Sequence, residues 1–224
     1  MRHFLTRRLE KLTFEIIILA LLFIACLGIL FLIAGMVFQE KSTRLDDLVF
    51  AFIVPYTNGS TTAFFQFITF FGSPLFLTTA NIVLAGVFLI KKDHRIYSLK
   101  IVAVAITSTA VMFLLKIILQ RERPLVPLIS KAHGYSFPSG HSFSSMVFFG
   151  MLAYIIFRNV RPKVLKWILV VSCFLFAILI GFSRIYLKLH YASDVIAGFC
   201  LGIIWLLLAK WLLVKTQKLV IPEQ

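Results

Sequence analysis

Long apolar runs alternate with short polar segments along the whole chain. A helix that crosses a bilayer needs about 20 residues, so the shorter runs need extra turns from their flanks. The pattern predicts an all-α polytopic membrane protein with six transmembrane helices. The six runs are Ile16–Phe38, Pro74–Ile90, Tyr97–Ile118, Ser142–Phe157, Trp167–Phe182 and Val195–Val214.

The stretch Leu48–Phe71 does not read as a seventh span, because Pro55 and the Asn58-Gly59 turn signal interrupt it. We expect a short helix here that lies at the outer membrane interface and leads into the second span. Its phenylalanine-rich part, residues 64–71, suits an aromatic belt that anchors the helix at the head-group level. A path for a lipid chain along these rings is the alternative.

Composition agrees with a membrane protein of one domain. The chain is 60% hydrophobic and only 14% charged, with a mean hydropathy of +0.97, whereas soluble proteins are about a quarter charged. So little sequence separates the apolar runs that we expect residues 1–224 to form a single domain. The first run exceeds the roughly 7–15 apolar residues of a cleavable signal peptide, so we expect it to remain as a span.

The basic residues indicate the orientation. With the N-terminus in the cytoplasm, 15 of the 23 Lys and Arg residues lie on the cytoplasmic side and 8 on the other. The positive-inside rule therefore places both termini in the cytoplasm. The net charge of +14 is divided between the two sides and makes no continuous stripe for nucleic acid. We expect the bilayer as the environment, no nucleic-acid partner, and leave the oligomeric state open.

Three motifs in the second half of the chain carry the candidate chemistry. They read Lys116-x6-Arg123-Pro124, Pro138-Ser139-Gly140-His141 and Ser183-Arg184-x5-His190-x3-Asp194. The predicted topology brings all three to the outer face. Together they supply three cations, two imidazoles and a carboxylate, which suits binding a phosphate and transferring it to a histidine.

Each motif has a physical reading of its own. If helix continued from Lys116 to Arg123, both side chains would point the same way, although a terminal lysine also snorkels to the interface. Ser139 and Gly140 open the fourth span, where the unpaired backbone N–H groups of a helix N-terminus form a site for an anion. The alternative is that Ser139 only caps the helix. His190 and Asp194 are four residues apart, so we expect both side chains on one face of the opening turn of the last helix. There the carboxylate would orient the imidazole.

The motifs closely resemble those of the type 2 phosphatidic acid phosphatase (PAP2) family of integral membrane lipid phosphatases. This family shares its site with bacterial acid phosphatases and vanadium haloperoxidases, and no motif position departs from its pattern. The resemblance implies a PAP2/haloperoxidase-like helical core, His190 as nucleophile, Asp194 as its orienting partner and His141 as general acid. It also implies phosphate binding by Lys116, Arg123, Ser139, Gly140 and Arg184. It implies neither a metal nor another cofactor.

The resemblance implies a bacterial cytoplasmic (inner) membrane enzyme with its active site on the extracytoplasmic side. Expected substrates are phosphatidylglycerol phosphate, undecaprenyl pyrophosphate, phosphatidic acid or lipid A phosphates. Transfer of phosphate to a second lipid and lipid-phosphate transport without catalysis are the alternatives, and vanadate-dependent halide oxidation is disfavoured. His133 lies near the motifs, where a loop histidine without a role is favoured over a contact to a head group.

Overall fold

The computed structural model describes residues 2–90, 95–129 and 134–220, which form helices and connecting loops. A π-helical turn, Gly35–Gln39, extends the first helix, and a 3-10 turn, Val54–Tyr56, follows the second. The α-helices are α1 (Arg2–Ala34), α2 (Arg44–Ile53), α3 (Gly59–Phe70), α4 (Pro74–Ile90), α5 (Arg95–Leu119), α6 (Gly140–Asn159), α7 (Lys163–Tyr186) and α8 (Ala192–Val220).

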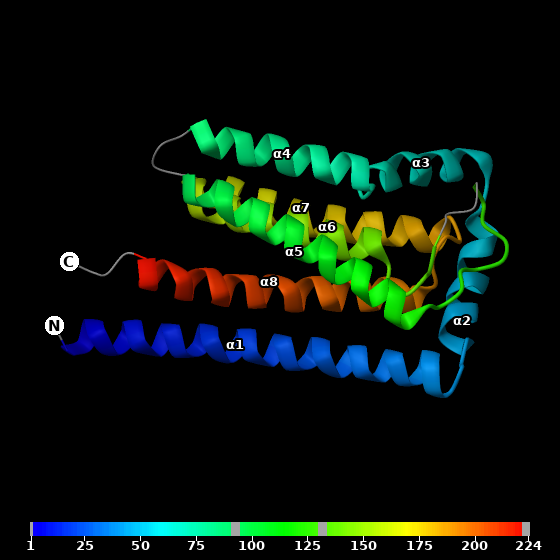
Figure 1. Cartoon of the computed structure of the whole chain (residues 1–224), viewed down its shortest axis with the longest axis horizontal. Coiled ribbons are helices and arrows are strands. Elements are labelled where there is room, and N and C mark those ends of the chain that lie inside the picture. The colour runs from blue at the N-terminus through cyan, green and yellow to red at the C-terminus, as the bar shows by residue number, and fades with distance from the viewer. Residues whose placement is uncertain (1, 91–94, 130–133, 221–224) are drawn as a thin grey trace.

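The predicted all-α membrane architecture is confirmed. Among the described residues, five helices are long and apolar enough to cross a membrane, and the number is six when α3 and α4, which are bent by 41° at their break, are counted as one span. The long helices run side by side, and both chain termini lie at the same end of the bundle (Figure 1). Helix α2 crosses the opposite end (Figure 1).

The expectation of one interfacial helix within residues 48–71 needs correction, because this stretch contributes to two helices. Helix α2 lies across the end of the bundle, whereas α3 continues into α4. The break between them has a local cause: the Asn58 side chain accepts a hydrogen bond from the Thr61 amide at 3.0 Å, and the Asn58 amide donates one to the Thr61 hydroxyl at 3.2 Å. This capping box starts a new helix at Gly59.

Some rings of the phenylalanine-rich segment pack inside the bundle, and others are exposed. The Phe65 ring packs on Tyr186 of α7, with 4.3 Å between ring centroids. Phe64, Phe67 and Phe70 are exposed on the bundle surface. The segment therefore holds α3 against α7 while presenting further rings outward, as an aromatic belt requires.

Helix α6 is the most enclosed span and packs against both α7 and α8. Close approach to α8 depends on glycine, because a Cβ on Gly198 would lie 2.7 Å from the Ser139 carbonyl oxygen. The contact is completed by the Ser139 amide, which donates to the Asp194 backbone oxygen at 3.0 Å. This packing joins the first turn of α6 to the first turn of α8.

A capped turn reverses the chain between α7 and α8. The Leu189 amide donates to the Arg184 carbonyl oxygen at 3.0 Å, and Lys188 between them has a φ of 53°. This is the hydrogen bond of a Schellman cap, with a lysine in the left-handed position that glycine usually occupies. The turn places His190 directly before α8.

Candidate functional site

The three motifs meet at the end of the bundle that α2 crosses. Lys116 lies in the last turn of α5, the Ser139–His141 segment opens α6, and Arg184 lies in the last turn of α7. Lys116 interacts electrostatically with Arg123 and Arg184. His141 is within electrostatic range of these three cations and of His190. Residues from α5, α6, α7 and the loops beside them thus surround one small volume.

His190 and Asp194 face each other as their spacing predicts, but not on one helix. Helix α8 begins at Ala192, so His190 lies in the preceding turn. His190 Nδ1 is 3.5 Å from Asp194 Oδ2, and His190 is only 1% exposed. The Tyr191 amide donates to the same oxygen at 2.9 Å, so the turn and the carboxylate hold each other in place.

The tautomer of His190 follows from its contact with Arg123. Arg123 Nη1 lies 3.1 Å from His190 Nε2. A guanidinium only donates hydrogen bonds, so Nε2 is the accepting nitrogen and the ring proton sits on Nδ1, toward Asp194. The lone pair of Nε2 therefore points at the cation cluster.

Burial lowers the pKa of His190 to about 4, and the interaction with Asp194 opposes this shift. The imidazole is therefore neutral at neutral pH, because its pKa lies below the usual value of about 6.5. A neutral ring keeps the Nε2 lone pair available for bonding to an electrophile.

Arg123 lies in the site, but it is placed there by a loop and not by the helix that its spacing from Lys116 suggested. Helix α5 ends at Leu119, and Gln120 has a φ of 41°, so no helix continues from Lys116 to Arg123. Instead Arg123 is held by carbonyl oxygens: Nε donates to Gly134 at 2.8 Å and Nη1 to Leu189 at 2.7 Å. Burial lowers the pKa of its guanidinium from the ordinary value.

The other two cations are held in a similar way. Lys116 Nζ donates to the Tyr135 carbonyl oxygen at 2.6 Å. Arg184 is only 5% exposed and donates from Nη1 to Thr69 Oγ1 at 2.8 Å. Its buried Nε has no hydrogen-bond partner among the described residues. A buried donor without a partner is costly, and an anion in the site is one way to satisfy it.

The Ser139–His141 segment forms the helix N-terminus that its sequence predicts. Ser139 is the N-cap of α6, and its buried hydroxyl accepts hydrogen bonds from Ser142 N at 3.4 Å and Ser142 Oγ at 2.9 Å. Lys116 lies beside Gly140, since a Cβ there would be 3.7 Å from Lys116 Cε. The first amides of α6 thus open toward a cation, which is a favourable place for an anion.

Four polar residues that the motifs do not include complete the site. Asp46 lies on α2, Arg121 and Ser136 lie in the connection before α6, and Ser193 opens α8. Ser136 Oγ donates to Asp194 Oδ2 and is 3.3 Å from His190 Nδ1. Arg121 was recognisable only as a cation adjoining the first motif, and nothing in the local sequence distinguishes Asp46 from neighbouring Asp47.

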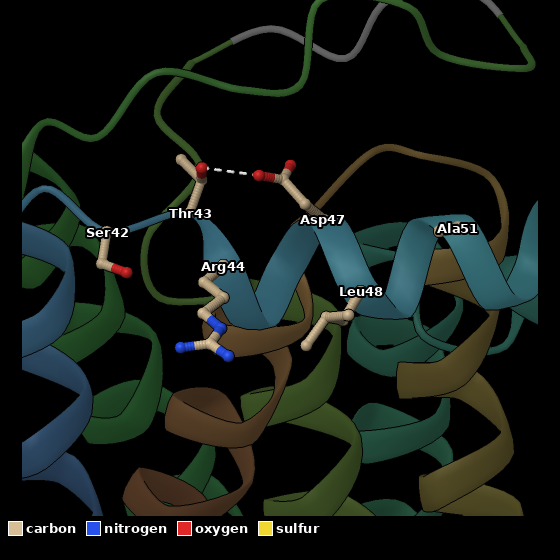
Figure 2. A pocket seen from close by; sticks show the side chains of 6 residues that line it. All are labelled: Ser42, Thr43, Arg44, Asp47, Leu48 and Ala51. Atoms are coloured by element: carbon tan, nitrogen blue, oxygen red, sulfur yellow. Dashed lines mark hydrogen bonds between the residues drawn. The ribbon is translucent and has the colours of Figure 1, made fainter.

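Two surface hollows lie at this end of the molecule. One of about 240 Å³ opens beside the site itself and includes Arg123 and Leu189 in its wall. The other, of about 580 Å³, follows the start of α2 (Figure 2). The described residues contain no group of three or more His, Cys, Asp or Glu side chains arranged to hold a metal ion. His133 lies outside the described residues.

Comparison with known proteins assigns the family. A sequence model of the PAP2 superfamily matches residues 97–218, which is more than half of the chain. The chain belongs to the PAP2 superfamily. It is also 31% identical to phosphatidylglycerophosphatase B of Bacillus subtilis (strain 168) over 147 residues, which cover 64% of this chain and 70% of that protein.

Solved structures share the fold. A transmembrane PAP2-type phosphatidylglycerolphosphate phosphatase from Bacillus subtilis superposes with a TM-score of 0.79 at 22% identity, covering 86% of this chain and 96% of the other. Aquifex aeolicus LpxE superposes with a TM-score of 0.56 at 26% identity, covering 72% and 92%. The chain is therefore a multi-pass membrane enzyme of the PAP2 lipid phosphatase type.

Proposed function

We propose that the protein hydrolyses a phosphate monoester or pyrophosphate on a membrane lipid through a phosphohistidine on His190. The observation that carries the proposal is the orientation of the His190 ring. Its Nδ1 faces Asp194 at 3.5 Å, and its Nε2 faces Arg123 at 3.1 Å, where a bound phosphate would lie. We place the activity in a single domain of residues 1–224, because Asp46 of α2 pairs with Arg121 in the site.

The reaction takes two steps. His190 Nε2 attacks phosphorus, the N–P bond forms, and the bond from phosphorus to the lipid oxygen breaks while His141 donates a proton to that oxygen. Water then attacks the phosphohistidine, His141 accepts the water proton, and the P–N bond breaks to release phosphate. Asp194 stabilises the positive charge that the His190 ring gains in the first step.

The cations perform the electrostatic part of the reaction. Phosphoryl transfer spreads charge over the equatorial oxygens, and preorganised donors stabilise that charge in the transition state. We assign this role to Lys116, Arg123, Arg184 and the first turn of α6 at Ser139 and Gly140. Because these groups supply the positive charge, we expect activity without a divalent metal ion.

The relatives support the substrate class that we propose. Phosphatidylglycerophosphatase B of Bacillus subtilis makes phosphatidylglycerol phosphate the first candidate, and undecaprenyl pyrophosphate, phosphatidic acid and lipid A phosphates complete the panel. We place the site at the extracytoplasmic face of a bacterial cytoplasmic membrane. The support is that the site and the termini lie at opposite ends of the bundle (Figure 1), and that most basic residues lie at the terminal end.

The deciding experiment is phosphate release by the purified protein in detergent with EDTA, across this lipid panel, beside the His190→Ala variant. We expect release by the wild type and a loss of at least about 10³-fold in the variant, because no other group supplies the nucleophile. Vanadate, which mimics five-coordinate phosphorus, should inhibit. Near-normal turnover by His190→Ala contradicts the mechanism, and abolition by EDTA alone contradicts metal independence. Labelled phosphate that appears on an acceptor lipid indicates transfer instead of hydrolysis.

A further inference from the structure

An arginine outside the motif positions bridges two buried carboxylates beside His190. Arg121 Nη1 donates to Asp194 Oδ1 at 2.6 Å, and Nη2 donates to Asp46 Oδ2 at 2.7 Å. Asp46 is 1% exposed and the Arg121 side chain 12% exposed. Asp46 comes from α2, far from Asp194 in sequence, so the bridge joins the helix across the bundle end to the start of α8.

Further hydrogen bonds hold both terminal nitrogens of Arg121 and both oxygens of Asp46. Ser193 accepts a hydrogen bond from Arg121 Nη1 at 2.8 Å and donates to Asp46 Oδ2 at 2.8 Å, while its amide donates to Asp46 Oδ1 at 2.9 Å. The Tyr191 ring covers the guanidinium at 4.0 Å. With both terminal nitrogens committed and one face covered, Arg121 is poorly placed to bind a phosphate.

The two carboxylate oxygens of Asp194 have different partners. Oδ1 is held by Arg121, which leaves Oδ2 for Ser136, the Tyr191 amide and the His190 ring. Rotation of the carboxylate would break hydrogen bonds at both oxygens, so Oδ2 is held beside Nδ1. The two carboxylates and the guanidinium together carry one negative charge, which still favours the charged ring that forms during transfer.

We propose that Asp46 and Arg121 are positioning residues, which hold Asp194 in the orientation that aligns His190 for attack on phosphorus. This inference rests on the proposed function, because it assigns His190 as the nucleophile. Their hydrogen bonds go to Asp194, Ser193 and each other, so we expect their substitution to change the rate of transfer and not the affinity for phosphate.

The pH profile separates positioning from a purely structural role. The charged groups that act on His190 are Asp194, Arg184, Arg123 and the protonated His141. Arg121 and Asp46 act on it through Asp194. Loss of the Arg121 cation favours a protonated His190 and moves the acid limb of kcat/KM to higher pH. Loss of the Asp46 charge moves it to lower pH.

The test compares Asp46→Asn, Arg121→Met and Arg121→Lys in the full-length protein. Asp47→Asn is the matched control, because Asp47 follows Asp46 on α2 but its exposed carboxylate accepts a hydrogen bond from the Thr43 hydroxyl, at 2.6 Å, away from Arg121 and Asp194 (Figure 2). The measurements are kcat, KM, the inhibition constant of inorganic phosphate, the pH profile and the thermal midpoint in detergent.

We expect Asp46→Asn and Arg121→Met to lower kcat roughly 10- to 100-fold, while KM and the phosphate inhibition constant change less than about 3-fold. Arg121→Lys should recover part of kcat, because lysine reaches one carboxylate and not two. The acid limb should move in opposite directions in the two charge-removing variants, and Asp47→Asn should match the wild type.

Wild-type kcat in Asp46→Asn overturns the proposal. A phosphate inhibition constant that rises with the loss of kcat identifies Arg121 as a substrate ligand instead, and lost activity with an unmoved pH profile identifies a structural role. If Arg121→Met does not fold, Asp46→Asn decides. An active His190→Ala variant refutes the proposed function itself, whereas an inactive His190→Ala beside a fully active Asp46→Asn refutes only the positioning role.

Discussion

At the scale of single residues, the site is organised around one neutral imidazole. Arg123 on Nε2 and Asp194 near Nδ1 determine which nitrogen carries the proton. Ser136 adds a hydroxyl that contacts both Asp194 and His190. The chemistry proposed for the protein therefore depends on hydrogen bonds that orient the nucleophile as much as on the nucleophile itself.

Substitution of the orienting carboxylate tests this view. Asp194→Asn keeps the shape of the side chain but removes its charge, so the ring is no longer held in the attacking tautomer. We expect kcat to fall about 10²- to 10⁴-fold with little change in KM, measured by phosphate release. An increase in KM with unchanged kcat contradicts an orienting role.

The depressed pKa of His190 makes a second prediction at this scale. Its pKa of about 4 lies below the usual 6.5, so the reactive neutral ring persists as the pH falls and is lost only as the pH passes through the lower value. The acid limb of kcat/KM, corrected for ionisation of the substrate, should therefore lie well below pH 6.5. A limb at or above pH 6.5 contradicts the assignment.

At the scale of elements, close contact between α6 and α8 brings two motifs together. Gly198 lies where the Ser139 turn crosses α8, and the Ser139 amide bonds to the Asp194 carbonyl oxygen. The N-terminus of α6, which we propose binds the phosphate, thus lies against α8, which carries Asp194. Any side chain at this crossing separates the two.

Gly198→Ala tests the crossing. The added Cβ would lie 2.7 Å from the Ser139 carbonyl oxygen and 3.0 Å from Ser142 Cβ, so the backbones must move apart. We expect a loss of about 1–3 kcal/mol in stability, seen as a lower thermal midpoint in detergent, together with weaker phosphate inhibition. Gly86→Ala is the control, because a Cβ there meets nothing within 4 Å. Equal behaviour of the two variants contradicts the packing argument.

At the scale of the whole molecule, the bundle separates its chemistry from its termini. The site lies at the end that α2 crosses, and both termini lie at the other end (Figure 1). The apolar surfaces of α1, α5 and α7 are largely exposed, as expected of helices that face lipid. Under the proposed function, a lipid would stay in the bilayer while its phosphate enters the site.

Cysteine labelling in intact cells tests the orientation. Leu125, 83% exposed beside the site, and Asn159, at the far end of α6, mark the two sides. A membrane-impermeant maleimide should label Leu125→Cys in intact cells but Asn159→Cys only after permeabilisation. The three native cysteines are buried and give a low background. The reverse pattern contradicts an extracytoplasmic site.

Two features of the chain were readable from local sequence. Apolar runs predict membrane-spanning helices because a bilayer forces each crossing segment to satisfy its backbone internally, whereas the division of residues 48–71 between α2 and α3 was not predicted. The motif residues were recognisable because phosphate chemistry demands particular side chains at particular spacings. The all-α membrane fold was correctly predicted from the apolar runs, and the PAP2 family from the resemblance of the motifs.

Only the tertiary structure decided how these residues meet. Lys116 and Arg123 converge through a loop and not along a helix, and His190 precedes α8 instead of lying on it. The pairing of Asp46 with Arg121 joins segments that are distant in the chain. The sequence determined which groups are present, because identity and periodicity are local properties. Their partners depend on helix packing and loop closure, which bring together residues that no local pattern connects.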